Sequence, residues 1–184
     1  QRAVMAGDPE IGTSCFRIVQ ELDAGDVYRI AARPMPEATA GELLELLAVS
    51  GAGQLAETIN AIAAGETPVP QEADGVTRAA KITVEDARVD FTRPAVEVRN
   101  HILGCSPEPG AWCELNGNRL KLYRARLADV QFTPAPGELY ATKRRVFVGA
   151  SGGVLELLEV QAPGKRRMAA IDWARSGAAS GRLV

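Results

Sequence analysis

The sequence predicts an α/β unit followed by a β-rich unit, with a linker between them. Three observations predict this order. Two β-branched stretches and a helical pattern fill residues 1–64, Pro and Gly punctuate residues 65–80, and short strand-like segments separated by turn residues dominate residues 81–184. A chain of 184 residues is long enough for two small domains with a core.

The first unit opens with two predicted strands. Residues 13–19 and 27–31 are β-branched and apolar, and the segment 21–26 between them contains the Asp and Gly residues that favour a turn. The residues that follow Gln1 show neither a helix cap nor strand alternation. We therefore expect the chain to begin inside a longer protein.

A helix is predicted after these strands. Thr39 and Glu42 have the spacing of a capping box, and leucines and isoleucines then recur at helical spacing. Gly51 and Gly53 fall inside this pattern and each costs about 1 kcal/mol relative to Ala, which predicts a bend or break. The Pro- and Gly-containing linker at residues 65–80 follows.

The second unit begins with a helix and continues as strands. Pro94 is typical of a helix start, and the helix after it places Val98, Ile102 and Cys105 on one face. Asn116-Gly117 predicts a tight hairpin between residues 112–115 and 119–123. About five short strands in a small domain fit a barrel of the oligonucleotide/oligosaccharide-binding (OB) kind. The other expected elements are strands at 124–130, 138–142, 145–148 and 154–160 and a helix at 169–175.

Charge divides the chain into two halves. Residues 1–77 hold four arginines against twelve Asp and Glu residues, a net charge of −8, whereas residues 78–184 have a net charge of +6. Such asymmetry indicates that the basic half meets a polyanion, although a basic surface is also a common solvated face.

The remaining composition excludes several classes of protein. The three cysteines, Cys15, Cys105 and Cys113, form no CxxC pair, which argues against a disulfide framework and against a zinc site. Each is interpreted as a small buried hydrophobe. No apolar run approaches the roughly 20 residues that span a bilayer. We therefore expect a cytoplasmic monomer without bound metal and without a membrane partner.

Four stretches carry a resemblance to a known family. Residues 6–28, which contain Leu-Asp-Ala-Gly, and residues 39–47 resemble part of a folate-dependent formyltransferase domain. Residues 81–112 and 157–168 resemble the C-terminal domain of methionyl-tRNA formyltransferases. The resemblance implies that residues 1–64 are the remnant of a Rossmann-like formyltransferase domain and that residues 81–184 are a complete OB-like domain that binds tRNA.

The same resemblance implies the reaction and its site. The family transfers a formyl group from 10-formyltetrahydrofolate to the amino group of initiator methionyl-tRNA. Asp23 matches the family's catalytic aspartate, and the Asn and His that act with it lie upstream of Gln1, so this chain alone is expected to be inactive. Without the resemblance, Asp23 would be interpreted as a turn residue. By resemblance, the folate pocket is lined by Val19, Gln20, Glu21 and Leu22.

Three basic groups are candidates for contact with RNA, and the alternative for each residue is an ordinary solvated surface. The groups are Arg119, Lys121, Arg124 and Arg126; Lys143, Arg144 and Arg145; and Lys165, Arg166 and Arg167.

Alternative functions are another folate-dependent formyltransferase, a formyltetrahydrofolate hydrolase, or a non-catalytic RNA-binding fragment.

Overall fold

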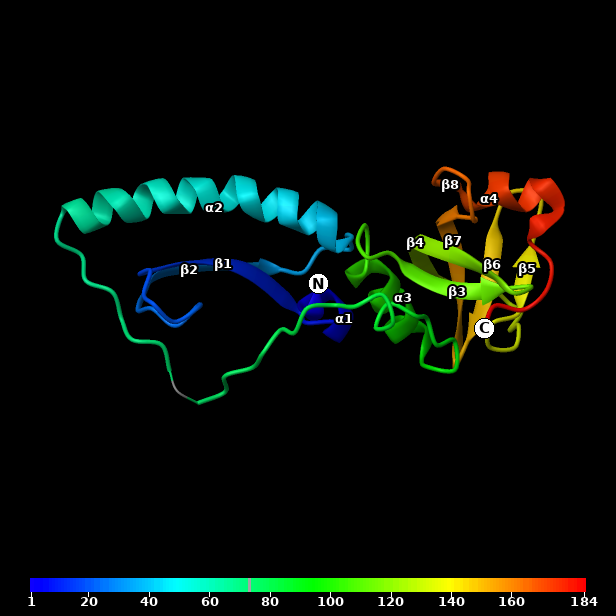
Figure 1. Ribbon diagram of the computed structural model, residues 1–184, viewed down its shortest axis with the longest axis horizontal. Helices are drawn as coiled ribbons and strands as arrows, with labels where there is room; N and C mark the ends of the chain where they lie inside the picture. Colours follow the sequence, from blue (N-terminus) through cyan, green and yellow to red (C-terminus); the bar gives the residue numbers. More distant parts are fainter. Residues whose placement is uncertain (73) are drawn as a thin grey trace. The chain divides into compact units, whose positions relative to one another are not determined.

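The computed structural model describes residues 1–72 and 74–184, which form two compact units (Figure 1). The larger, called here the C-terminal unit, comprises residues 1–7, 38–41 and 81–184. The smaller, called here the ribbon unit, comprises residues 8–37 and 42–80.

This division differs from the expected one at residues 1–64, 65–80 and 81–184, because two short segments of the first half pack with the second half. One of them is helix α1, Arg2–Ala6, which packs on α3, Ala95–Gly104. The approach is so close that a Cβ atom on Gly104 would lie 2.4 Å from Cγ of Met5. No periodic pattern in the sequence indicated this contact.

The ribbon unit consists of a two-stranded antiparallel sheet and a long helix (Figure 1). Both predicted strands are present and pair antiparallel: β1 spans Glu10–Phe16, three residues earlier than expected, and β2 spans Val27–Pro34. Helix α2 spans Ala40–Ala63. Thr13 of β1 donates to Oε1 of Gln54 at 2.5 Å, and Nε2 of Gln54 donates to the Thr13 carbonyl at 3.3 Å. This pair of hydrogen bonds fixes α2 to the ribbon.

Helix α2 is continuous, so the predicted bend or break at Gly51 and Gly53 is wrong. Two helical glycines cost about 2 kcal/mol, which a helix of 24 residues rich in Ala, Leu and Glu can absorb. Gly51 also lies against β1, since a Cβ atom there would be 3.5 Å from Cγ2 of Thr13. Packing on the ribbon therefore outweighs the local preference.

A six-stranded antiparallel sheet forms most of the C-terminal unit, in the order β3-β4-β7-β6-β5 with β8 on β7. The Asn116-Gly117 hairpin is confirmed, because both residues have positive φ, 51° and 75°. Strand β4 joins two segments that were predicted separately, and β8 was not predicted. The strands are β3 Ala111–Leu115, β4 Asn118–Ala128, β5 Leu139–Ala141, β6 Val146–Ala150, β7 Gly153–Gln161 and β8 Met168–Ala169.

Residues 181–184 join the two outer strands of this sheet. Leu183 forms an antiparallel bridge with Leu115 at the end of β3, and Arg182 forms one with Glu138 beside β5. The Leu183 side chain is buried. The sheet is thus closed on itself, which removes two exposed edges.

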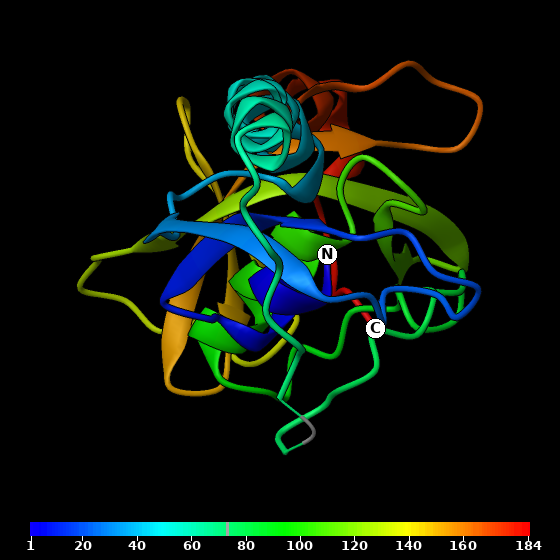
Figure 2. The same cartoon turned by 90° about the vertical axis from the view of Figure 1, so that its left-hand side faces the viewer.

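Helix α3 contacts β3, β4, β6 and β7 and begins after Pro94, as predicted. Figure 2 shows this helix, in green, among the strands of the C-terminal unit. Helix α4, Ala170–Trp173, continues into a wider turn, Ala174–Ala178, in which Gly177 has φ 80°. The last predicted helix is therefore confirmed. The core between the helices and the sheet includes Ile102, Cys105, Leu122, Val146, Val148, Leu155 and Val160.

Candidate functional site

Asp23 lies in an exposed turn between β1 and β2 of the ribbon unit. Its φ is 56°, in the left-handed region that few residues other than Gly adopt, although Asp tolerates it. The carboxylate is exposed, and the only histidine of the sequence, His101, belongs to the other unit. Asp23 thus lies on a turn with a defined backbone conformation. The ribbon unit contains no histidine that could act with it.

The base of this turn is closed by contacts between Arg17 and Asp26. The Arg17 amide donates to the Asp26 carbonyl at 2.8 Å, and their side chains form an ion pair at 3.7 Å. Gly25 is required where the two sides cross, because a Cβ atom there would lie 1.7 Å from the Arg17 carbonyl oxygen.

The sequence did not indicate the role of Gln71, which belongs to the predicted linker. Its side-chain amide nitrogen lies 2.8 Å from the Asp23 carbonyl oxygen and 2.7 Å from that of Gly25. Val69 pairs with Val27 through two backbone hydrogen bonds of 2.7 and 2.8 Å. Part of the linker therefore returns to the Asp23 turn.

The four expected folate-pocket residues precede Asp23 and all are exposed. Val19 and Leu22 present apolar side chains, the latter 92% exposed, beside the polar side chains of Gln20 and Glu21. Residues 19–22 lie outside any helix or strand. The segment therefore offers backbone hydrogen-bonding groups beside its apolar side chains.

The first basic group lies on β4. Leu120 and Leu122 are buried whereas Arg119 is exposed and Lys121 is half-buried, so the side chains alternate between the core and the surface, as in a strand with one buried face. The Arg119 guanidinium lies 3.9 Å from the centroid of the Trp112 ring, and Nζ of Lys121 donates to the Pro109 carbonyl at 3.0 Å. Both cations are therefore held in place.

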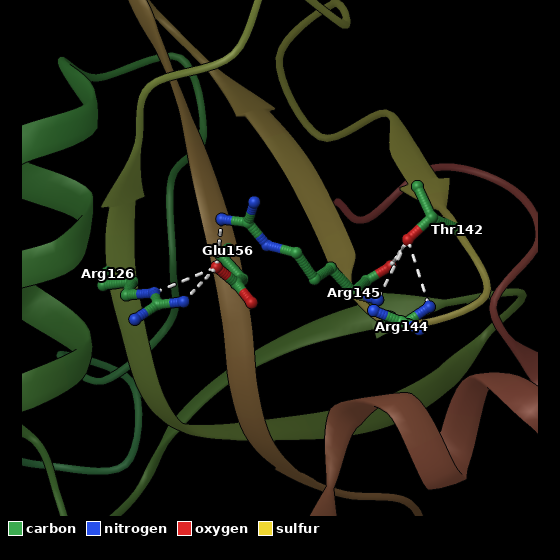
Figure 3. Close-up of polar contacts among 5 residues, drawn as sticks. All are labelled: Arg126, Thr142, Arg144, Arg145 and Glu156. Carbon is green, nitrogen blue, oxygen red and sulfur yellow. Dashed lines mark hydrogen bonds and ion pairs between the residues drawn. The ribbon is translucent and has the colours of Figure 1, made fainter.

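Members of two basic groups meet at Glu156 on β7 (Figure 3). Its Oε2 atom accepts from Nε of Arg126 at 2.9 Å and from a terminal nitrogen of Arg145 at 2.6 Å. Burial would raise the pKa of Glu156, but the hydrogen bonds and charges of Arg145 and Arg126 outweigh it and lower the pKa. The Thr142 hydroxyl accepts from the amides of Arg144 and Arg145 and shapes the adjoining turn.

The third basic group is anchored near β7. Arg167 pairs with Glu159 and lies 4.6 Å from the Tyr123 ring centroid, and Gln161 donates to the Lys165 carbonyl at 2.9 Å. Arg124 of the first group stands opposite Glu159 in the β4–β7 register. The side chains of Lys165 and Arg166, like those of Lys143 and Arg144, are exposed.

The other reactive side chains have structural surroundings. Burial lowers the pKa of His101, whose Nε2 lies 3.8 Å from Sγ of Cys105. Burial raises the thiol pKa of Cys105 to about 11 and of Cys113 to about 12, as expected of buried hydrophobes, whereas Cys15 is half-buried.

Among residues 1–72 and 74–184, no group of three or more His, Cys, Asp or Glu residues could hold a metal ion. No helix of the described residues is both long and apolar enough to cross a membrane.

The C-terminal unit matches a known domain family. Residues 81–177 match the family described as "Formyl transferase, C-terminal domain". A "Methionyl-tRNA formyltransferase" of Streptomyces coelicolor is 50% identical over 177 residues, and one of Cutibacterium acnes is 46% identical over 183 residues. Each match covers 95% of this chain but only 57% and 58%, respectively, of the relative. The chain thus spans little more than half the length of these relatives.

Solved structures share the fold at low identity. HypX from Aquifex aeolicus matches 96% of this chain and 32% of its own, with a TM-score of 0.74 and 20% identity. A "Methionyl-tRNA formyltransferase from Clostridium thermocellum" matches 88% of this chain and 60% of its own, with a TM-score of 0.60 and 13% identity.

Proposed function

Because this chain belongs to the formyl transferase C-terminal domain family, we propose that it is part of a methionyl-tRNA formyltransferase. The complete enzyme would transfer a formyl group from 10-formyltetrahydrofolate to the amino group of initiator methionyl-tRNA. The observation that carries this proposal is the similarity to two enzymes of that name along 95% of the chain. The chain covers 57–58% of their length, so we assign the activity to the longer protein.

Asp23 is proposed as the catalytic carboxylate. When the amine attacks the formyl carbon, a C–N bond forms and a tetrahedral oxyanion develops. Collapse breaks the bond between that carbon and the donor nitrogen, which gains a proton while the amine loses one. An exposed carboxylate on a shaped turn can orient a base and accept that proton through water. The His and Asn that would act with it are proposed to lie upstream of Gln1.

The folate donor is proposed to bind beside this turn. A pterin ring has two flat apolar faces and a hydrogen-bonding edge. The apolar side chains of Val19 and Leu22 and the backbone of residues 19–22 offer both kinds of contact. We assign no metal to the site.

Residues 81–184 are proposed to be an OB-like barrel that holds the tRNA. Residues 1–64 are proposed to be the remnant of a Rossmann-like domain, with residues 65–80 as the linker. Arg126, Arg145 and Arg167 are already paired with glutamates. The exposed Lys143, Arg144, Lys165 and Arg166 are therefore the better candidates for phosphate contact. We further propose a cytoplasmic monomer.

Two variants of the full-length protein test these roles separately. Asp23→Asn should abolish formyl transfer to charged initiator tRNA and leave tRNA affinity nearly unchanged. The double variant Lys165→Glu/Arg166→Glu should raise KM for tRNA and reduce the salt slope of binding by about 2, one for each phosphate contact. Wild-type turnover in Asp23→Asn would refute the catalytic assignment.

The acceptor is tested by the same assay. Formyl transfer to a small amine but not to methionyl-tRNA would favour another folate-dependent formyltransferase. Release of free formate would favour a formyltetrahydrofolate hydrolase. Binding of tRNA without turnover of the full-length protein would favour a non-catalytic RNA-binding role.

A further inference from the structure

The Asp23 turn has few supports of its own. Leu22 is 92% exposed, and Asp23 adopts a left-handed conformation that costs about 1 kcal/mol for a residue with a side chain. The contacts between Arg17 and Asp26 close only its base. Unless another segment restrains it, a turn with these properties samples several conformations.

Gln71 supplies that restraint from 48 residues further along the chain. Its Nε2 atom donates two hydrogen bonds, at 2.8 Å to the Asp23 carbonyl and at 2.7 Å to the Gly25 carbonyl. A primary amide has two N–H groups and can serve both acceptors at once. These bonds hold the backbone on both sides of Ala24 and leave the Asp23 carboxylate unengaged by Gln71.

The position of Gln71 is itself fixed. Val69, two residues earlier, forms reciprocal backbone hydrogen bonds with Val27, the first residue of β2. Val69 thus forms a single antiparallel bridge with the first residue of β2, and Gln71 follows two residues later. The amide of Gln71 is directed at the turn by this pairing.

We propose that Gln71 is a positioning residue that sets the orientation of Asp23 for formyl transfer. The inference rests on the proposed catalytic role of Asp23. Gln71 acts on the backbone carbonyls of the turn, not on the substrate. Without it, the turn would populate conformations in which the carboxylate is displaced from the reacting atoms, and small displacements of a catalytic group slow a reaction strongly.

The chemistry of the contact predicts an order among substitutions. Ala removes both donors, and Glu replaces them with a carboxylate that repels the two carbonyl oxygens, so both should fail. Asn keeps the two donors on a side chain that is one methylene shorter and should restore part of the activity.

The experiment measures formyl transfer by the full-length protein carrying Gln71→Ala, Gln71→Glu or Gln71→Asn. Gln131→Ala is the matched control, because it makes the same change at an exposed glutamine of the C-terminal unit. In Gln71→Ala we expect kcat to fall between about tenfold and about a hundredfold, with KM for methionyl-tRNA and the melting temperature nearly unchanged. Hydrogen exchange of residues 20–26 should become faster in the same variant.

The outcomes separate the two proposals. If Asp23→Asn is inactive and Gln71→Ala keeps the wild-type kcat, the positioning role is refuted and the catalytic role of Asp23 stands. If Asp23→Asn is active, the catalytic assignment itself fails. Equal activity in Gln71→Glu and Gln71→Asn would also refute the positioning role, since only the latter can donate to the turn.

Discussion

The two units of the molecule differ in where their apolar side chains lie. The C-terminal unit buries a contiguous core between a closed sheet and its helices. In the ribbon unit, leucine and isoleucine side chains of α2 such as Leu44 and Ile59 are more than half exposed, and Leu43 is a rare buried one. The C-terminal unit therefore covers its own apolar side chains, whereas the ribbon unit leaves much of the apolar surface of α2 uncovered.

The same substitution, Leu to Ala, made once in each unit tests this contrast, and we expect it to give the largest difference in the free energy of unfolding. Leu155→Ala, in the core of the C-terminal unit, should lower the free energy of unfolding by about 2–5 kcal/mol, because it leaves a cavity. Leu44→Ala, at a 66% exposed helix position, should change it by less than about 0.5 kcal/mol. Urea unfolding followed by circular dichroism measures both. Equal losses would contradict the contrast.

The ion pairs of Glu156 with Arg126 and Arg145 test how much charged contacts add to the stability of the C-terminal unit. Glu156→Gln should lower stability by about 1 kcal/mol at neutral pH, a modest value because both arginines are about half exposed. The folded-state pKa of Glu156 is lowered, so its contribution is present above the unfolded pKa, about 4.3, and is lost as pH falls through the folded pKa. Unfolding measured from pH 7 to pH 3 should show the two proteins converging in acid. A constant difference would exclude this role.

The smallest effect tests the ribbon unit. Gly53→Ala should stabilise α2 by about 0.5–1 kcal/mol, since a Cβ atom there meets nothing within 4 Å. The measurement is slower hydrogen exchange of the α2 amides. Gly65→Ala is the control, because that site is equally open but its φ of 96° disfavours Ala, and it should not stabilise. Faster exchange in Gly53→Ala would mean that α2 does need flexibility there.

Local signals predicted the elements that depend on neighbouring residues. Asn116-Gly117 predicted its hairpin because a tight turn needs positive φ at both positions. Pro94 predicted the start of α3 for a similarly local reason. The unbroken α2 was missed because packing against Thr13 is not visible in the local pattern around Gly51.

Contacts between distant residues account for most of what the sequence could not predict. The turn around Asp23 was predicted from its residues, but the hydrogen bonds from Gln71 join segments 48 residues apart and leave no periodic signal. The pairing of Arg126 and Arg145 with Glu156 depends in the same way on strand order. Arg126 and Arg145, which the sequence places among the candidate RNA-contacting residues, are thus partly neutralised by Glu156.

The seam at residues 181–184 has a consequence for biosynthesis. Strands β3 to β7 leave the ribosome before Leu183 does, so the nascent chain carries two unpaired strand edges, at Leu115 and near Glu138. The sheet can close only once residues 181–184 have been released.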